Sequence, residues 1–199
     1  MKENRKLKIR VSFFAILMLL VLVLSHSYIS LAALIAAALH ELGHIVAARI
    51  CKAPLDELKL GIFGASLFTK KEIGSYKDEL TIALAGPAVN LICAAFIMLF
   101  GKSTGEFGQM FLAGSLFLGI LNLLPITDFD GGRVLFCLVA LKYSLNSARS
   151  LLRISSFLLI FVLWSLSVYL ILRLGASLSL FVFSASLFCK IFIGNSGKN

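Results

Sequence analysis

The sequence predicts an all-α polytopic membrane protein with about six transmembrane helices and a membrane-dipping β-hairpin between helices two and three. The 199-residue chain is 59% hydrophobic and only 15% charged, with a mean hydropathy of +0.97. Soluble domains carry about 25% charged residues. Apolar runs long enough to cross a bilayer recur along the whole chain. The longest polar stretch covers about 51–79, so we expect a single membrane-embedded domain over 1–199.

Hydrophobic runs and their flanking residues define the expected helices. They cover about 11–30, 31–50, 79–100, 108–126, 151–173 and 176–194, and a short helical piece runs from Gly132 to about Leu141. A cleaved signal peptide would also begin with a basic segment like residues 1–10. The apolar run that follows is long for a signal peptide, and the sequence at 25–28 is a poor cleavage site. We therefore expect a retained first span.

The distribution of basic residues predicts the orientation of the chain. With the N-terminus in the cytoplasm, only Lys102 and Arg173 of the 19 lysines and arginines fall outside, which leaves 17 inside. Both termini are then cytoplasmic in a multi-pass protein of the cell membrane. The net charge of +9 does not indicate a nucleic-acid partner, because the basic residues flank apolar spans and form no aromatic-interleaved patch.

The most informative motif is the pentapeptide His40-Glu41-Leu42-Gly43-His44, which follows nine residues without a polar side chain. Histidines four apart on a helix share one face and can bind one metal ion. Glu41 lies beside them, where it can act as a general base toward water. An HExxH motif in an apolar helix therefore suggests a zinc hydrolase that works within the membrane. The predicted orientation places the motif near the cytoplasmic end of its helix.

A hydrolytic zinc site commonly has three protein ligands, so a further ligand is needed. His26 falls on the opposite side of the membrane in this orientation. The segment 122–133 reaches the histidine side and contains two carboxylates, Asp128 and Asp130, beside a proline and a glycine pair that break the helix. Both aspartates remain candidates on their chemistry, and both can also be surface-loop residues.

Three motifs, in the order in which they occur along the chain, resemble those of the site-2 protease family of intramembrane zinc metalloproteases. Within this family the chain most resembles the stage IV sporulation protein FB type. The three motifs are His40–His44, the AGPxxN segment 85–90, and an NLLP…DGG segment from 122 to 132, within a core of 31–141. The resemblance implies one Zn²⁺ per chain held by His40, His44 and Asp130. It also implies Glu41 as the general base and Asn122 as a residue that binds the substrate.

The same resemblance implies features around this core. Asn90 matches a polar position beside the active site, although a helix–helix hydrogen bond would explain it equally well. Thr127-Asp128-Phe129 departs from the family, in which proline or another apolar residue and then leucine precede the aspartate. Relatives often carry a PDZ or CBS domain. We expect neither here, so that regulation would act through a membrane partner or the membrane segments.

Hydrolysis of a peptide bond in a membrane-associated protein substrate, within the lipid bilayer, is the expected reaction. A helical substrate must unwind before cleavage, and the β-prone segment 58–69 resembles a hairpin that could pair with it. An amphipathic loop on the inner leaflet is the alternative for this segment. The alternative functions are a catalytically silent scaffold, a metal transporter and a lipid-modifying enzyme.

Overall fold

The computed structural model describes residues 8–11, 27–53, 57–61, 64–68, 75–101, 105–175 and 178–193. They form two compact units, Met1–Asn122 and Leu123–Asn199, and each is described by itself. The first predicted helix, 11–30, lies almost entirely outside the described residues, as does His26. The described part contains six α-helices, which confirms the helical class.

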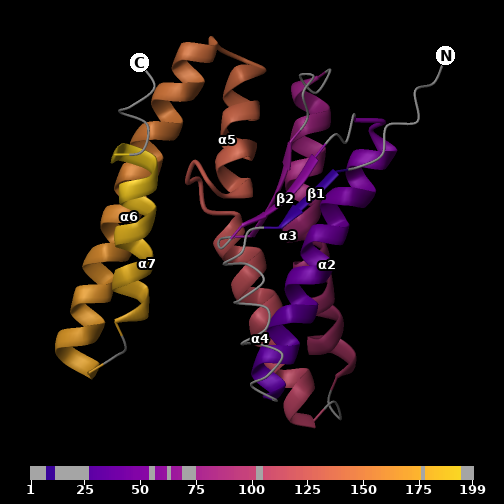
Figure 1. Ribbon diagram of the computed structural model, residues 1–199, viewed down its shortest axis with the longest axis vertical. Helices are drawn as coiled ribbons and strands as arrows, with labels where there is room; N and C mark the ends of the chain where they lie inside the picture. Colours follow the sequence, from indigo (N-terminus) through magenta and orange to yellow (C-terminus); the bar gives the residue numbers. More distant parts are fainter. Residues whose placement is uncertain are drawn as a thin grey trace. The chain divides into compact units, whose positions relative to one another are not determined.

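In the first unit, α2 (Tyr28–Ile50), α3 (Tyr76–Phe100) and α4 (Gly105–Asn122) pack against one another as a bundle (Figure 1). Side chains define where two of these helices begin. The hydroxyl of Ser27 accepts a hydrogen bond from the backbone of Ile29, and that of Ser75 accepts one from Lys77, both at 3.2 Å. Such caps satisfy backbone donors that the first helical turn leaves unpaired.

Small residues form most of the buried face of α2, at intervals of three and four. The buried positions on this helix are Ala32, Ala36, His40, Gly43, His44, Ala47 and Ala48. Large apolar side chains such as Leu42 and Ile50 are exposed instead. Small residues let the backbones of neighbouring helices approach closely, as is usual between membrane helices. The imidazoles of His40 and His44 therefore lie inside the bundle rather than on its outside.

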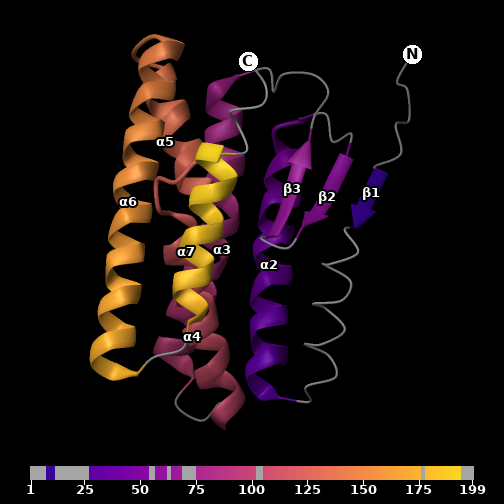
Figure 2. The same cartoon turned by 60° about the vertical axis from the view of Figure 1, so that its left-hand side comes forward.

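The first unit also contains a three-stranded sheet in the order β1–β2–β3. Strands β2 (Glu57–Gly61) and β3 (Gly64–Phe68) are antiparallel (Figure 2), in the segment where the sequence predicted a hairpin. That this segment dips into the membrane stays a prediction. Strand β1 (Lys8–Val11), parallel to β2, was not predicted, although its alternating polar and apolar residues are a strand pattern.

The second unit contains α5 (Asp130–Ala140), α6 (Leu145–Leu174), α7 (Ser179–Phe188) and the π-helical turn η1 (Cys189–Ile193). Helix α6 packs against both α5 and α7, and Figure 2 shows α6 and α7 side by side. Gly175 ends α6 in the left-handed conformation, with φ of +59°, which a glycine adopts at little cost. Residues 123–129 lead into α5, and we call them the Asp130 loop.

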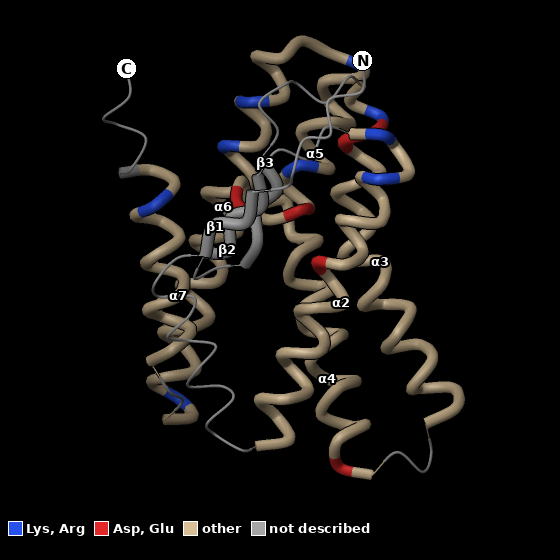
Figure 3. The backbone as a smooth tube through the Cα atoms, turned by 45° about the vertical axis from the view of Figure 1, so that its right-hand side comes forward, with Lys and Arg blue, Asp and Glu red and all other residues tan. Residues whose placement is uncertain are grey.

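Three of the described helices, α2, α3 and α6, are long and apolar enough to cross a membrane. Their charged residues gather mostly near helix ends, as the tube coloured by charge shows within each unit (Figure 3). The sequence predicted about six transmembrane helices, and three of them are supported as candidate spans among the described residues. The predicted 108–126 helix begins earlier and ends earlier than expected, as α4, because the chain leaves the helix before Pro125.

Candidate metal centre and active site

His40 and His44 lie on the buried face of α2, with 4% and 5% of their surface exposed. Their Nε2 atoms are 3.2 Å apart, and the rings meet edge to face. Two nitrogens bound to one tetrahedral zinc ion, each at 2.0–2.1 Å, would be roughly 3.3 Å apart. The spacing of the two imidazoles therefore fits a shared zinc ion.

The hydrogen bond of His44 defines which of its nitrogens can bind a metal. Its Nδ1 lies 2.7 Å from the carbonyl oxygen of Ile82 on α3. A carbonyl can only accept, so Nδ1 carries the proton and donates it. The lone pair is then on Nε2, the atom that faces His40. A backbone carbonyl that orients an imidazole in this way is a common feature of metal sites.

Asn90 of α3 lies beside Nδ1 of His40, just as the carbonyl of Ile82 lies beside Nδ1 of His44. Its side chain is fully buried, and its Nδ2 lies 3.4 Å from Nδ1 of His40. In this orientation the amide oxygen has no hydrogen-bond partner among the described residues. A half-turn of the amide group would let Nδ1–H of His40 donate to that oxygen. That arrangement satisfies the buried oxygen and leaves Nε2 of His40 to bind a metal.

Gly86 and Gly43 explain why small residues occur in two of the motifs. A Cβ atom on Gly86 would collide with the ring of His44 and would lie 2.9 Å from Nε2 of His40. On Gly43 it would lie 2.7 Å from the carbonyl oxygen of Ala85. The glycine of the AGP motif thus makes room for the two imidazoles. The glycine inside HELGH lets α2 approach α3.

The Asp130 loop packs closely against the first turn of α5. A Cβ atom on Gly131 would collide with the carbonyl of Leu123, and one on Gly132 would collide with the carbonyl of Ile126. Only glycine fits at both positions, because each obstacle is backbone that cannot rotate away. The DGG motif therefore permits the loop to fold back over the first turn of α5, which begins at Asp130.

The predicted metal ligands are His40 and His44, which belong to the first unit, and Asp130, which belongs to the second. Two imidazoles and one carboxylate are a donor set that zinc accepts in hydrolytic sites. Asp128, the alternative ligand, instead forms an ion pair with Lys190, with 3.0 Å between the carboxylate and the ammonium nitrogen. The role of each aspartate as a ligand stays a prediction.

Glu41 and Asn122 occupy their predicted elements, and their roles remain predictions. Glu41 is partly buried and directly follows His40 on α2. Asn122 is the last residue of α4, and its amide nitrogen donates to the carbonyl of Leu118 at 3.1 Å. An amide oxygen at this helix end remains suited to accept a hydrogen bond from a substrate backbone.

Sequence reasoning missed Ser155, Ser156 and Lys190, which contact the Asp130 loop and belong to none of the three motifs.

The fold and the site together define a helical protein with candidate membrane spans and a candidate metal centre of the HExxH type. No family model matches the chain. A zinc metalloprotease of Methanocaldococcus jannaschii is 32% identical over 159 residues, which is 73% of this chain and 44% of the relative. Rip3 of Mycobacterium tuberculosis, provisionally named a zinc metalloprotease, is 34% identical over 48% of this chain and 26% of its own length.

A solved structure is similar over nearly the whole chain. It is the site-2 protease from Methanocaldococcus jannaschii, with a TM-score of 0.63, 22% identity, and coverage of 94% of this chain and 90% of that one. The sequence is thus similar to zinc metalloproteases, and the fold is similar to that of a site-2 protease. The chain spans less than half the length of these two curated relatives.

Proposed function

We propose that this protein is an intramembrane zinc endopeptidase, which hydrolyses a peptide bond in or near the membrane segment of a protein substrate. The observation that carries the proposal is the pair of buried imidazoles, whose Nε2 atoms lie 3.2 Å apart while Nδ1 of His44 is held by Ile82. With the Asn90 amide turned so that its oxygen faces Nδ1 of His40, this geometry presents two lone pairs to one metal ion. The sequence similarity to zinc metalloproteases supports the same activity.

In this proposal His40, His44 and Asp130 hold one zinc ion, and Glu41 is the general base. Bound zinc would supply Lewis-acid chemistry, polarising the scissile carbonyl and activating water. Glu41 takes a proton from the attacking water and later delivers it to the leaving amine. Asn122 would accept a hydrogen bond from the substrate backbone and orient the scissile bond.

The substrate has to be unwound, because a membrane helix satisfies its own carbonyls and hides them. Strand β3 lies at an edge of the three-stranded sheet, so its outer side can pair with an extended segment. We propose that an unwound substrate adds to this edge before cleavage. The likeness to sporulation proteases would make a membrane-associated transcription-factor precursor one substrate, whereas the names of the relatives specify none.

The proposed orientation has both termini in the cytoplasm and the metal site toward the cytoplasmic side of the membrane. Its support is the distribution of lysine and arginine, of which only Lys102 and Arg173 fall outside. Reporter domains inserted after Lys102 and after Lys52 should therefore report opposite sides of the membrane. Equal signals from both insertions would contradict this orientation.

Proteoliposomes containing the full chain and a single-span model substrate test the activity. We expect fragments that disappear when zinc is removed with a chelator and return when zinc is restored. Metal flux across the same vesicles without any cleavage would overturn the proposal and favour a transporter. Zinc binding without cleavage of any member of a substrate panel would instead indicate a silent scaffold.

A further inference from the structure

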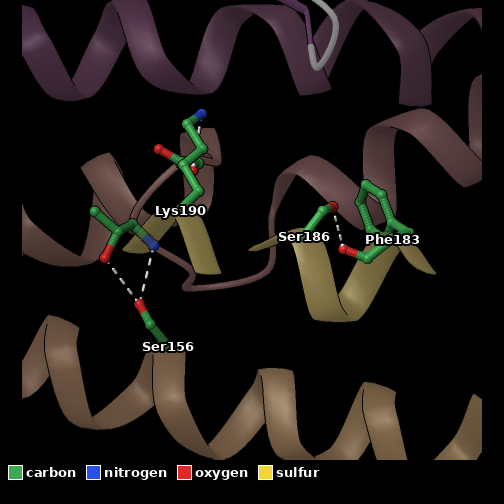
Figure 4. A network of polar contacts seen from close by, with 6 residues as sticks. Ser156, Phe183, Ser186 and Lys190 are labelled. Carbon is green, nitrogen blue, oxygen red and sulfur yellow. Dashed lines mark hydrogen bonds and ion pairs between the residues drawn. The ribbon is translucent and has the colours of Figure 1, made fainter. Parts of the chain in front are cut away.

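The Asp130 loop is fastened to α6 and η1 by polar contacts from residues outside the three motifs of the sequence. Ser155 and Ser156 on α6 and Lys190 on η1 provide them. Figure 4 shows the side chains of Ser156 and Lys190. The contacted residues are Pro125, Thr127 and Asp128, all within five residues of Asp130. Two of these, Thr127 and Asp128, are positions at which the sequence departs from the site-2 protease pattern.

Ser156 is the central contact. Its side chain is fully buried, and its hydroxyl lies 2.7 Å from the carbonyl of Leu152, to which it donates. It also accepts from the backbone N–H of Thr127 at 2.9 Å, and lies 3.0 Å from the hydroxyl of that residue. A hydroxyl has one proton and two lone pairs. With the proton given to Leu152, the hydroxyl of Thr127 must donate, and Ser156 is then fully satisfied.

Ser155 and Lys190 contact the Asp130 loop before and after Thr127. The hydroxyl of Ser155 donates to the carbonyl of Pro125 at 2.8 Å, which is shorter than its 3.0 Å separation from the carbonyl of Leu152. Lys190 pairs with Asp128 at 3.0 Å, and the two side chains are 50% and 25% exposed. A pair this exposed contributes little stability by itself. It can still select one position of the loop.

The loop transmits its position to the metal ligand through tight packing. Ile126 is fully buried and Phe129 is 6% exposed, with the Phe129 ring stacked on Phe183 of α7. The carbonyl of Ile126 presses against Gly132, where even a methyl group would collide. The backbone of Phe129 accepts from Gly132 at 3.0 Å. A shift of the loop therefore has to move the first turn of α5, and Asp130 begins that turn.

We propose that Ser156 is a positioning residue for the metal ligand Asp130, assisted by Lys190 through Asp128. The C-terminal helices thereby set how well the carboxylate is placed for metal. The inference rests on the proposed function, since it assumes that Asp130 binds zinc. It assigns a role to Thr127 and Asp128, two positions that differ from the family pattern and that contact α6 and η1.

Zinc affinity of the purified full chain, measured by competition with a chelator, tests the inference without relying on proteolysis. Ser156→Ala should lower the affinity by about 10- to 100-fold, the usual effect of losing a group that orients a metal ligand. It should also change the absorption spectrum of the cobalt-substituted protein. Ser167→Ala is the matched control, because Ser167 is similarly buried on α6 but donates to Trp164 of its own helix.

Lys190 and Thr127 provide independent variants should Ser156→Ala fold poorly. Lys190→Gln should weaken zinc binding and Lys190→Arg should restore it, because arginine can still pair with Asp128. Thr127→Val removes the hydroxyl but keeps the backbone N–H, so it should cause a smaller loss in the same direction. Both side chains lie at or near the surface, where substitution disturbs packing little.

The outcomes separate this inference from the proposed function. Wild-type zinc affinity and an unchanged cobalt spectrum in Ser156→Ala and Lys190→Gln would overturn the inference while leaving proteolysis intact. A wild-type chain that binds zinc but cleaves no membrane protein would contradict only the proposed function. A wild-type chain that binds no zinc would overturn both.

Discussion

His44 on α2 donates its Nδ1 proton to the carbonyl oxygen of Ile82 on α3, at 2.7 Å and with a separation of 38 residues in the sequence. This single bond orients one metal ligand and joins two helices. It occurs about one turn before Pro87, which has no N–H and leaves the carbonyl of Ala83 without its helical donor. Pro87 therefore removes one backbone hydrogen bond of α3 close to the carbonyl that binds His44.

Glu41→Gln should abolish cleavage and leave zinc binding unchanged. Glutamine keeps the shape of the side chain but cannot take a proton from water, and loss of general-base catalysis costs about 10²- to 10⁴-fold in rate. Fragment formation in proteoliposomes and zinc content of the purified protein measure the two effects. Glu106→Gln, at the exposed start of α4, is the control and should cleave normally. Activity retained by Glu41→Gln would disprove the proposed mechanism.

Gly86→Ala should disrupt the metal site, although Gly86 lies on α3, which supplies none of the proposed ligands. The added methyl group would collide with His44, so the imidazoles must move or α3 must shift away. We expect at least a roughly 10-fold loss of zinc affinity, together with destabilisation of about 1–3 kcal/mol from overpacking. Zinc competition and thermal unfolding in detergent measure both.

Gly114→Ala on α4 is the matched control for Gly86→Ala. Its Cβ would have Ala33 Cα as its nearest neighbour, at an ordinary 4.0 Å. Alanine also favours a helix over glycine by up to about 1 kcal/mol. The control should therefore bind zinc normally and unfold at the same or a higher temperature. Equal behaviour of the two variants would show that room for the imidazoles does not limit metal binding.

Asp130→Asn and Asp128→Asn should have different effects on zinc stoichiometry. An amide is a poor zinc ligand compared with a carboxylate, so Asp130→Asn should lose most of the bound metal. Asp128→Asn removes only the charge that pairs with Lys190 and should keep one zinc per chain, with weaker affinity. Metal content by mass spectrometry distinguishes the two. The reverse pattern would transfer the ligand role to Asp128.

Asn90→Ala should weaken zinc binding by about 10- to 100-fold, because His40 would lose the group beside its Nδ1. Ser115→Ala provides a control with another fully buried polar residue of the same unit. The hydroxyl of Ser115 has no hydrogen-bond partner among the described residues. Its removal should leave zinc affinity unchanged and should be neutral or stabilising. If Asn90→Ala also binds zinc normally, the asparagine serves only to join helices.

Much of the helical fold follows from the pattern of the sequence. The expected segments 31–50, 79–100 and 151–173 correspond to α2, α3 and α6, with ends that differ by at most six residues. Long apolar runs bounded by polar caps specify such helices locally. Strand β1 was missed because four residues give a weak signal and its partner β2 lies about 49 positions later, a pairing that only the folded chain reveals.

The site was predictable where its chemistry lies within one motif. The spacing of His40 and His44 alone implies a shared metal, and the structure confirms that their Nε2 atoms converge. The partner of His44 could not be predicted, because a backbone carbonyl such as that of Ile82 carries no sequence signal. Ser156 was equally hidden, since a serine in an apolar helix usually bonds its own preceding turn and here does so as well.

The space that Gly86 leaves for the imidazoles has a consequence for protein engineering. A metal site of this kind cannot be moved to another scaffold as five consecutive residues, since a neighbouring helix with ordinary side chains would fill the volume that the rings require. The smallest transferable part that keeps the histidine pair is two helices, with the glycine on one of them level with the histidines on the other, and Asp130 has to be supplied by a third segment. Searches for related sites in distant sequences should accordingly look for the two segments together.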